Sequence, residues 1–213
     1  MSQFRTEEDT LGPVQIPQEA LWGPQTERSR HNFPTGQFMP LAIIRALLNI
    51  KKAAAQANLE LNQIDEAKGK LIIEAIDQLL VLPDDDLRKD FPLKVYQTGS
   101  GTQTNMNTNE VVANLAKRLN PDVTVLPNDD VNKGQSSNDV YPTAMNIVAV
   151  EALDQLLPAV QHLIDELKAK QEQYWHVVKV GRTHLQDATP LTFGQEVSGY
   201  VAALEHDRDY LKQ

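Results

Sequence analysis

The chain has 213 residues, of which 41% are hydrophobic and 23% are charged, and it contains no cysteine. This balance is typical of a globular protein, and the lack of cysteine excludes a disulfide scaffold, a thiolate nucleophile and a cysteine-ligated zinc site. The net charge of −9, without any basic stripe, argues against a nucleic-acid partner.

The first 37 residues are rich in proline, glycine and polar side chains, and they predict extended or irregular structure. They contain no basic region followed by an apolar run, so we expect no signal peptide. No uninterrupted apolar stretch approaches the roughly 18 residues that predict a membrane span. We therefore expect a soluble, cytoplasmic protein that has no membrane partner.

Helical periodicity dominates the rest of the chain. Apolar residues at helical spacing predict a helix from Pro40 to about Leu61 and a second helix around 71–79, which ends at Pro83. The acidic run at 84–86 predicts a solvated loop rather than a metal cluster.

Two longer helices are predicted near the C-terminal end. The first runs from about Pro142 to Lys170. Its apolar surface is wide, so this helix needs packing partners on more than one side. The second begins at Thr192, whose spacing to Gln195 matches a capping box. Few partners for these helices are visible in the chain, so we expect a bundle that other subunits, or further sequence, complete.

The first polar segment, TGSGTQTNMNTNE at 98–110, joins a glycine turn to a run of hydroxyl and amide side chains. Glycines let a backbone approach a ligand closely, and free N–H groups at a helix start favour an anion. Thr102, Asn105 and Asn109 would share one helix face. A plain glycine-serine loop with helix caps is the alternative, but the amide-rich continuation favours a carboxylate site. A nucleotide P-loop is disfavoured because no Gly-Lys-Ser/Thr follows.

The second polar segment, PNDDVNKGQSSND at 127–139, precedes the long helix. One of its residues, such as Asp139, could simply cap that helix, but capping does not explain the whole run from Gln135 to Asn138. Serine and asparagine can bind a carboxylate without adding net charge.

The third segment, GRTHLQDATP at 181–190, contains His184 between a strand-like run at 177–180 and a helix. A lone histidine is more often structural than catalytic, but this one lies within a polar cluster. The other four histidines are assigned to structure or surface, and no pair has metal-ligand spacing, so no metal site is predicted.

These segments together resemble the class II fumarases of the fumarase/aspartase superfamily. The resemblance rests on GSGTQTNMNTNEV at 99–111, NDDVNKGQSSNDVYPTAM at 128–145 and GRTHLQDATPLTFGQE at 181–196, and it begins as early as DTLG at 9–12. It implies an all-α fold in which an N-terminal helical domain, 1–138, is followed by the start of a long central helical bundle, 139–213. It also implies a homotetramer whose active sites are shared between subunits.

The resemblance further implies the reversible anti addition of water to fumarate, giving (S)-malate in the tricarboxylic acid cycle, without metal or organic cofactor. By position, His184 matches the catalytic proton donor or acceptor. The implied substrate-binding residues are Ser100, Gly101, Thr102, Ser136, Ser137, Asn138 and Thr183. Because the net charge opposes a dianion, attraction must be local, with Lys133 and Arg182 as candidate cations.

Two departures from the family pattern stand out. The catalytic serine loop of the form GSSxMPxKxN is absent, so we expect this chain to be an inactive N-terminal fragment of a longer enzyme. A secondary dicarboxylate site would involve Leu126, Pro127, Asn128 and Asp129, but Leu126 stands where many class II fumarases have histidine. An upstream arginine of that site is also not evident, and we expect the site not to function.

Two alternatives remain open. Aspartate ammonia-lyase has a related fold but typically carries glutamine at the position of His184, so histidine favours water over ammonia as the leaving group. A non-catalytic, crystallin-like oligomer would keep the scaffold, but the retention of the substrate-contacting residues argues against it.

Overall fold

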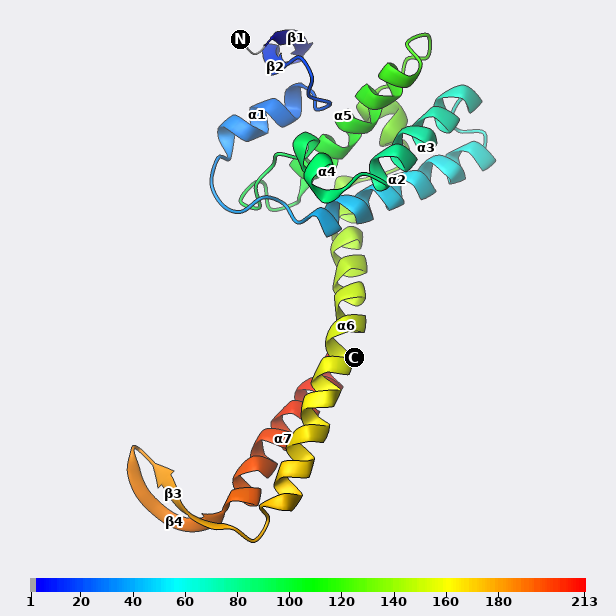
Figure 1. Ribbon diagram of the computed structural model, residues 1–213. Coiled ribbons are helices and arrows are strands. Elements are labelled where there is room, and N and C mark those ends of the chain that lie inside the picture. Colours follow the sequence, from blue (N-terminus) through cyan, green and yellow to red (C-terminus); the bar gives the residue numbers. More distant parts are fainter. Residues whose placement is uncertain (1–2) are drawn as a thin grey trace. The chain divides into compact units, whose positions relative to one another are not determined.

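The computed structural model describes residues 3–213 and is mainly helical, with two small two-stranded sheets (Figure 1). The helices agree with the predicted all-α class. The chain divides into a first unit, which extends through Val148, and a second unit, Ala149–Gln213. The expected domain boundary at 138/139 stays a prediction.

Residues 3–37 are more ordered than predicted. Strands β1 (Phe4–Asp9) and β2 (Gly12–Pro17) form an antiparallel hairpin, and helix α1 (Pro24–Asn32) follows. The expectation of irregular structure was therefore wrong for α1. This helix has little apolar periodicity of its own, and contacts from side chains distant in sequence stabilise it.

Glu110 is the distant residue that satisfies the start of α1. Its buried carboxylate accepts hydrogen bonds from the backbone N–H groups of Gly23, Gln25 and Thr26 at 2.9, 2.9 and 3.1 Å. These N–H groups lie at the positive end of the helix dipole and have no partner within α1. A carboxylate from helix α5 (Thr102–Leu119) thus replaces a local N-cap.

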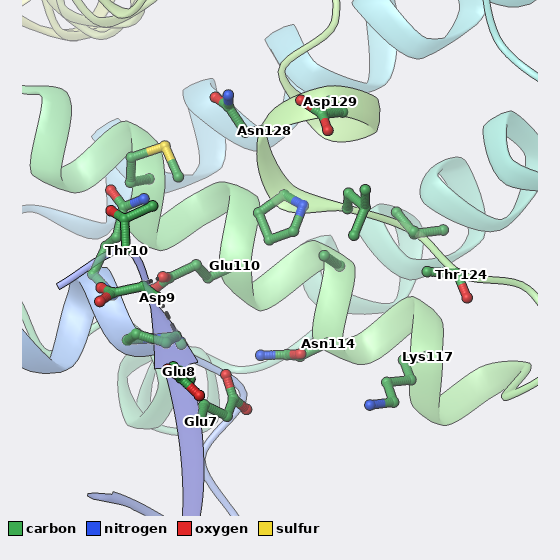
Figure 2. A pocket seen from close by; sticks show the side chains of 18 of the residues that line it. Glu7, Glu8, Asp9, Thr10, Glu110, Asn114, Lys117, Thr124, Asn128 and Asp129 are labelled. Carbon is green, nitrogen blue, oxygen red and sulfur yellow. Dashed lines mark hydrogen bonds between the residues drawn. The ribbon is translucent and has the colours of Figure 1, made fainter. Parts of the chain in front are cut away.

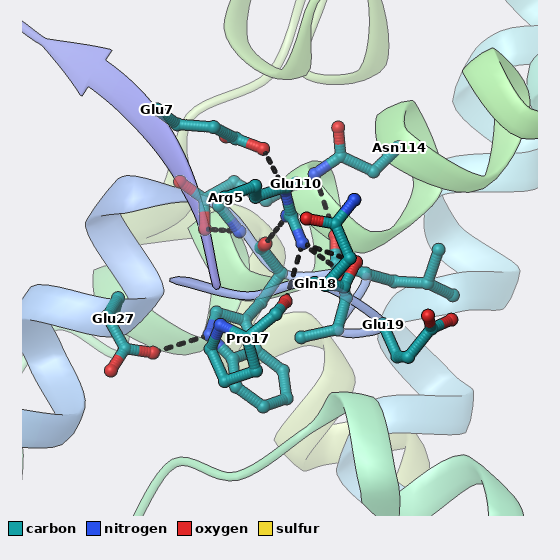
Figure 3. A network of polar contacts seen from close by, with 12 residues as sticks. Arg5, Glu7, Pro17, Gln18, Glu19, Glu27, Glu110 and Asn114 are labelled. Atoms are coloured by element: carbon teal, nitrogen blue, oxygen red, sulfur yellow. Dashed lines mark hydrogen bonds and ion pairs between the residues drawn. The ribbon is translucent and has the colours of Figure 1, made fainter. Parts of the chain in front are cut away.

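Arg5 fastens the hairpin to the chain that leads into α1 (Figure 3). Its guanidinium group donates hydrogen bonds to the carbonyl oxygens of Pro17, Ala20 and Trp22 at 2.8, 2.7 and 2.8 Å. The five donors of a guanidinium group suit such convergent carbonyls in this irregular segment.

The core of the first unit is built from α2 (Leu41–Glu60), α3 (Glu66–Leu80) and α5 (Thr102–Leu119), which pack against one another. The apolar stripes predicted for α2 and α3 are buried there. The run at 84–86 forms the first turn of α4 (Asp84–Asp90), so the predicted loop was wrong. Its carboxylates remain exposed, and their negative charge stabilises the positive end of the helix dipole. Leu87 in the same helix is buried.

Helix α6 (Ser137–Gln173) begins before the predicted start and continues through Pro158. In the first unit, Val140 and Ala144 of α6 join the core. In the second unit, α6 packs on α7 (Phe193–Leu211) through Ile164, Val197 and Val201. The predicted capping box of α7 is confirmed, because the Thr192 and Gln195 side chains each accept the other's backbone N–H.

Apolar side chains on α6 and α7 remain exposed. They include Met145, Val150, Leu156, Leu163 and Tyr200. Within residues 3–213, α6 is the one helix whose length and composition would allow it to cross a membrane, a criterion that core helices of soluble proteins also meet. The expectation from uninterrupted apolar runs overlooked this helix, and the predicted lack of a membrane partner stays a prediction.

The Glu110→Ala substitution tests the link between α5 and α1. It leaves three buried or half-buried N–H groups without their acceptor, so we expect the free energy of unfolding of the whole protein to fall by about 2 kcal/mol. Chemical denaturation measures the change. Glu60→Ala, at the exposed end of α2, is the matched control, and equal effects of the two substitutions would contradict this role for Glu110.

Candidate active site

Three of the predicted substrate-binding hydroxyls meet in the first unit. The Thr102 Oγ1 atom lies 3.0 Å from Ser100 Oγ and 2.9 Å from Ser137 Oγ. Ser100 belongs to the glycine turn and Thr102 to the start of α5, whereas Ser137 begins α6. The fold therefore joins the first and second polar segments of the sequence.

Gly101 sets the direction of the turn before α5. Its φ of +68° lies in the left-handed region, and an added Cβ would lie 2.2 Å from the Tyr141 ring. A side chain at this position is therefore excluded both by the backbone conformation and by α6. The packing of Tyr141 against Gly101 keeps the starts of α5 and α6 together.

Two helix N-termini converge on these hydroxyls. Thr102 is the first residue of α5, and Ser137 is the first residue of α6. Ser136 closes the first turn of α6, because its carbonyl accepts the N–H groups of Asp139 and Val140 at 3.1 and 2.9 Å. Helix starts carry partial positive charge, so this arrangement suits an anion that the hydroxyls can also bind.

The side chains of Ser136 and Asn138 are exposed beside this cluster. Their predicted roles as substrate ligands stay predictions. Lys133, a candidate cation, is half-buried on the turn that precedes them.

Asn105 and Asn109 lie on the same buried face of α5, one and two turns after Thr102. Their side-chain nitrogens donate to the Asn132 Oδ1 atom at 3.0 and 3.2 Å. Both asparagines therefore hold the second polar segment in place, which the sequence pattern alone did not reveal. Their own Oδ1 atoms are buried without a hydrogen-bond partner in the described part of the chain.

Lys51 is a polar residue of this region that the sequence analysis missed. Its side chain on α2 is fully buried, and its Nζ atom donates to Asn132 Oδ1 at 2.8 Å and to Gln135 Oε1 at 2.9 Å. Burial lowers the pKa of Lys51 to about 7. A signal was available, since Lys51 falls on the apolar stripe of α2, three and four residues after Leu48 and Leu47.

Thr183 and His184 belong to the second unit, on a hairpin of β3 (Val178–Thr183) and β4 (Gln186–Thr192). The strand-like run before His184 is confirmed, but the loop expected between it and the helix at Thr192 is a hairpin, in which β4 follows His184. The two-residue tip, His184 and Leu185, has φ values of 50° and 63°. A two-residue hairpin turn of this kind needs positive φ at both positions, which costs energy for residues other than glycine.

His184 is exposed at the tip, and Leu185 is 97% exposed. Arg182, the other candidate cation, is exposed beside it and 3.8 Å from Asp187. Strained tips with exposed polar groups are frequent at functional sites. The meeting of His184 with the hydroxyl cluster stays a prediction.

The segment 126–129 lines a separate cavity of about 690 Å³ in the first unit (Figure 2). Pro127 to Asp129 begin a short π-helical turn, η1 (Pro127–Val131), whose Asp130 carboxylate is held by Lys68 at 2.9 Å. The charged residues lining the cavity are Glu7, Glu8, Asp9, Glu110, Asp129 and Lys117. This acidic lining opposes a dicarboxylate, in keeping with the expected loss of the secondary site, which itself stays a prediction.

Comparison with known proteins places this geometry in a family. A family model described as "Lyase" matches residues 12–213. The chain belongs to this lyase family. The fumarate hydratase class II of Myxococcus xanthus is 54% identical over 216 residues, which cover 98% of this chain and 46% of that protein. The corresponding protein of Bacillus subtilis is 48% identical over 98% of this chain and 46% of its own length.

Solved lyase structures share the fold. A class II fumarase from Schistosoma mansoni superposes with a TM-score of 0.83 at 44% identity, covering 97% of this chain and 44% of that one. A fumarate lyase:delta crystallin from Brucella melitensis gives a TM-score of 0.84 at 41% identity, covering 99% and 50%. The chain thus spans about half the length of the relatives it matches. The resemblance to class II fumarases is confirmed.

The lowered pKa of Lys51 predicts a pH-dependent cost of burial. Below about pH 7 the ammonium is charged in both the folded and unfolded states, and the cost is fully present. Between about pH 7 and 10.5 the unfolded state binds more protons, so the free energy of unfolding rises with pH. In Lys51→Met this rise is lost. The stability of Lys51→Met relative to the parent protein should therefore decrease as the pH rises through this window.

Chemical denaturation of the whole protein at about pH 6 and about pH 9 measures this difference. Lys52→Met is the matched control, because Lys52 pairs with Asp77 on the exposed side of the same helix. A Lys51→Met difference that does not change with pH would contradict a buried ammonium at this position.

Proposed function

We propose that the whole protein is a fumarate hydratase that catalyses the reversible anti addition of water to fumarate, giving (S)-malate in the tricarboxylic acid cycle. The observation that carries the proposal is the meeting of the Ser100, Thr102 and Ser137 hydroxyls at two helix N-termini. The names and identities of the relatives support the substrate class. The class of enzyme is a carbon–oxygen lyase.

In this mechanism, neutral donors bind the two carboxylates of the diacid. Ser100, Thr102 and Ser137 hold one end, and Gly101 lets the backbone approach it closely. Ser136, Asn138 and Thr183 supply further contacts. Such preorganised donors stabilise the extra negative charge that develops when a C–H bond next to a carboxylate is broken. They do so although the formal net charge of the chain is −9.

His184 moves a proton to or from the water that is added or lost. A positioned imidazole can both accept and donate a proton, which suits it to this task. The strained, exposed tip of the β3–β4 hairpin leaves its ring free to reach a substrate. No metal or organic cofactor takes part in the proposed reaction.

The proposed assembly is a homotetramer with active sites shared between subunits. Exposed apolar side chains of α6 and α7 support it, since contiguous apolar faces mark interaction surfaces. We also propose a cytoplasmic location and no nucleic-acid or membrane partner. A catalytic serine loop would come from sequence beyond these 213 residues, so the chain alone would be inactive.

Substrate choice tests the proposal against aspartate ammonia-lyase. The whole protein should hydrate fumarate and dehydrate (S)-malate, because His184 stands where the ammonia-lyases carry glutamine. Absorbance of fumarate measures both directions, and a coupled ammonia assay with aspartate is the comparison. Ammonia release without malate dehydration would refute the assignment.

The His184→Asn substitution tests the catalytic group. Loss of the proton-transferring imidazole should lower kcat of the whole protein by about 10²–10⁴-fold. His176→Asn, an exposed histidine before the same hairpin, is the control and should retain the parent activity. Unchanged turnover in His184→Asn would remove this residue from the mechanism.

A further inference from the structure

Lys51 is a buried amine without an anionic partner. In the described part of the chain its ammonium group donates to two neutral amide oxygens, those of Asn132 and Gln135, and it makes no ion pair. Moving an ammonium out of water costs several kcal/mol unless an opposite charge offsets it. A neutral donor would avoid this cost, so a lysine at this buried position calls for a function.

The groups that Lys51 holds lead directly to the proposed substrate site. Gln135 adjoins Ser136 in sequence, and its side-chain nitrogen donates back to the Val131 carbonyl at 3.0 Å. Asn132 donates to the Gln135 carbonyl at 3.1 Å, which closes the turn 132–135. The position of this turn decides where the chain enters α6 at Ser137.

Helix α2 fastens the turn at a second point. The Asn58 side chain, two turns after Lys51 on the same face of α2, donates to the Lys133 carbonyl at 3.1 Å. The turn contains Gly134 at a φ of +70°, where side chains are strained, so its shape depends on such contacts. Lys51 fixes the end of the turn nearest the substrate-binding residues.

Helix α5 connects the same ammonium to the other half of the site. Asn105, one turn after Thr102, donates to the Asn132 oxygen that also accepts from Lys51. Lys51 and helix α5, which begins at Thr102, are therefore connected through the Asn132 oxygen that both bind. The Thr102–Ser137 hydrogen bond then joins the start of α5 directly to the start of α6.

We propose that Lys51 is a positioning residue of the dicarboxylate site, which holds the 132–135 turn in place and supplies a buried positive charge whose counter-charge is the bound substrate. This inference rests on the proposed function. The substrate class is a small dicarboxylate dianion. Lys51 acts through other residues, because its Nζ atom donates to the Asn132 and Gln135 side chains.

The test compares two variants of the whole protein that differ in what they remove. Lys51→Met removes the charge and the donors, whereas Lys51→Gln removes the charge but keeps an amide donor. We expect both to raise KM for fumarate and for (S)-malate by about tenfold or more, with a smaller change in kcat. Fumarate hydration and malate dehydration are measured at saturating and limiting substrate.

Two lysines serve as matched controls. Lys52→Met removes an exposed ammonium from the same helix, and Lys68→Met removes the ion pair to Asp130 at the other end of the second polar segment. Both should retain the parent KM. Thermal unfolding and native mass show that each variant is folded and assembled, and if Lys51→Met does not assemble, Lys51→Gln carries the test.

The outcomes separate the two proposals. If the parent protein does not hydrate fumarate, the proposed function fails before any variant is examined. If the parent is active and both Lys51 variants keep its KM, the role of Lys51 is refuted. If Lys51→Gln matches the parent while Lys51→Met does not, only a neutral anchor is needed, and the proposed charge role is refuted.

Discussion

The side-chain oxygen of Asn132 accepts hydrogen bonds from Lys51, Asn105 and Asn109, and the arrangement of the candidate site depends on this shared acceptor. The donors come from α2 and α5, whereas Asn132 precedes α6. A buried polar group that lost its partners would cost more than one exposed to water, so the three segments are held in one relative position. The hydroxyls of Thr102 and Ser137 meet as a consequence.

The candidate site would attract the proposed substrate only at short range, because the net charge of the chain is negative. At −9, these 213 residues would repel the proposed dianionic substrate at long range. Helix N-termini, hydroxyls and amides act only within a few ångströms, where their fixed orientation matters more than net charge. Glu110 shows the same principle in a structural role, since it binds the N-terminus of α1 as an anion would.

Strain and exposure distinguish the hairpin that carries His184 from the rest of the second unit. His184 and Leu185 have positive φ angles, which are strained for residues with side chains and would not be strained for glycine. The nearby helices α6 and α7 bury Ile164, Val197 and Val201 between them but leave other apolar residues in contact with water. Both features fit a unit that works within a larger assembly.

The sequence alone determined the helical class, the apolar stripes of α2 and α3 and the capping box of α7, because these depend on residues close together in the chain. It also singled out the segments that contain Ser100, Thr102 and Ser137, from their unusual density of hydroxyls and amides. Only the tertiary structure showed that these hydroxyls touch, since their contact depends on how α5 and α6 pack. Likewise, α1 depends on Glu110, and Lys51 binds Asn132 and Gln135, partners too distant in sequence for local periodicity to identify. Local periodicity could place Lys51 on the apolar stripe of α2, but it could not show what the side chain contacts there.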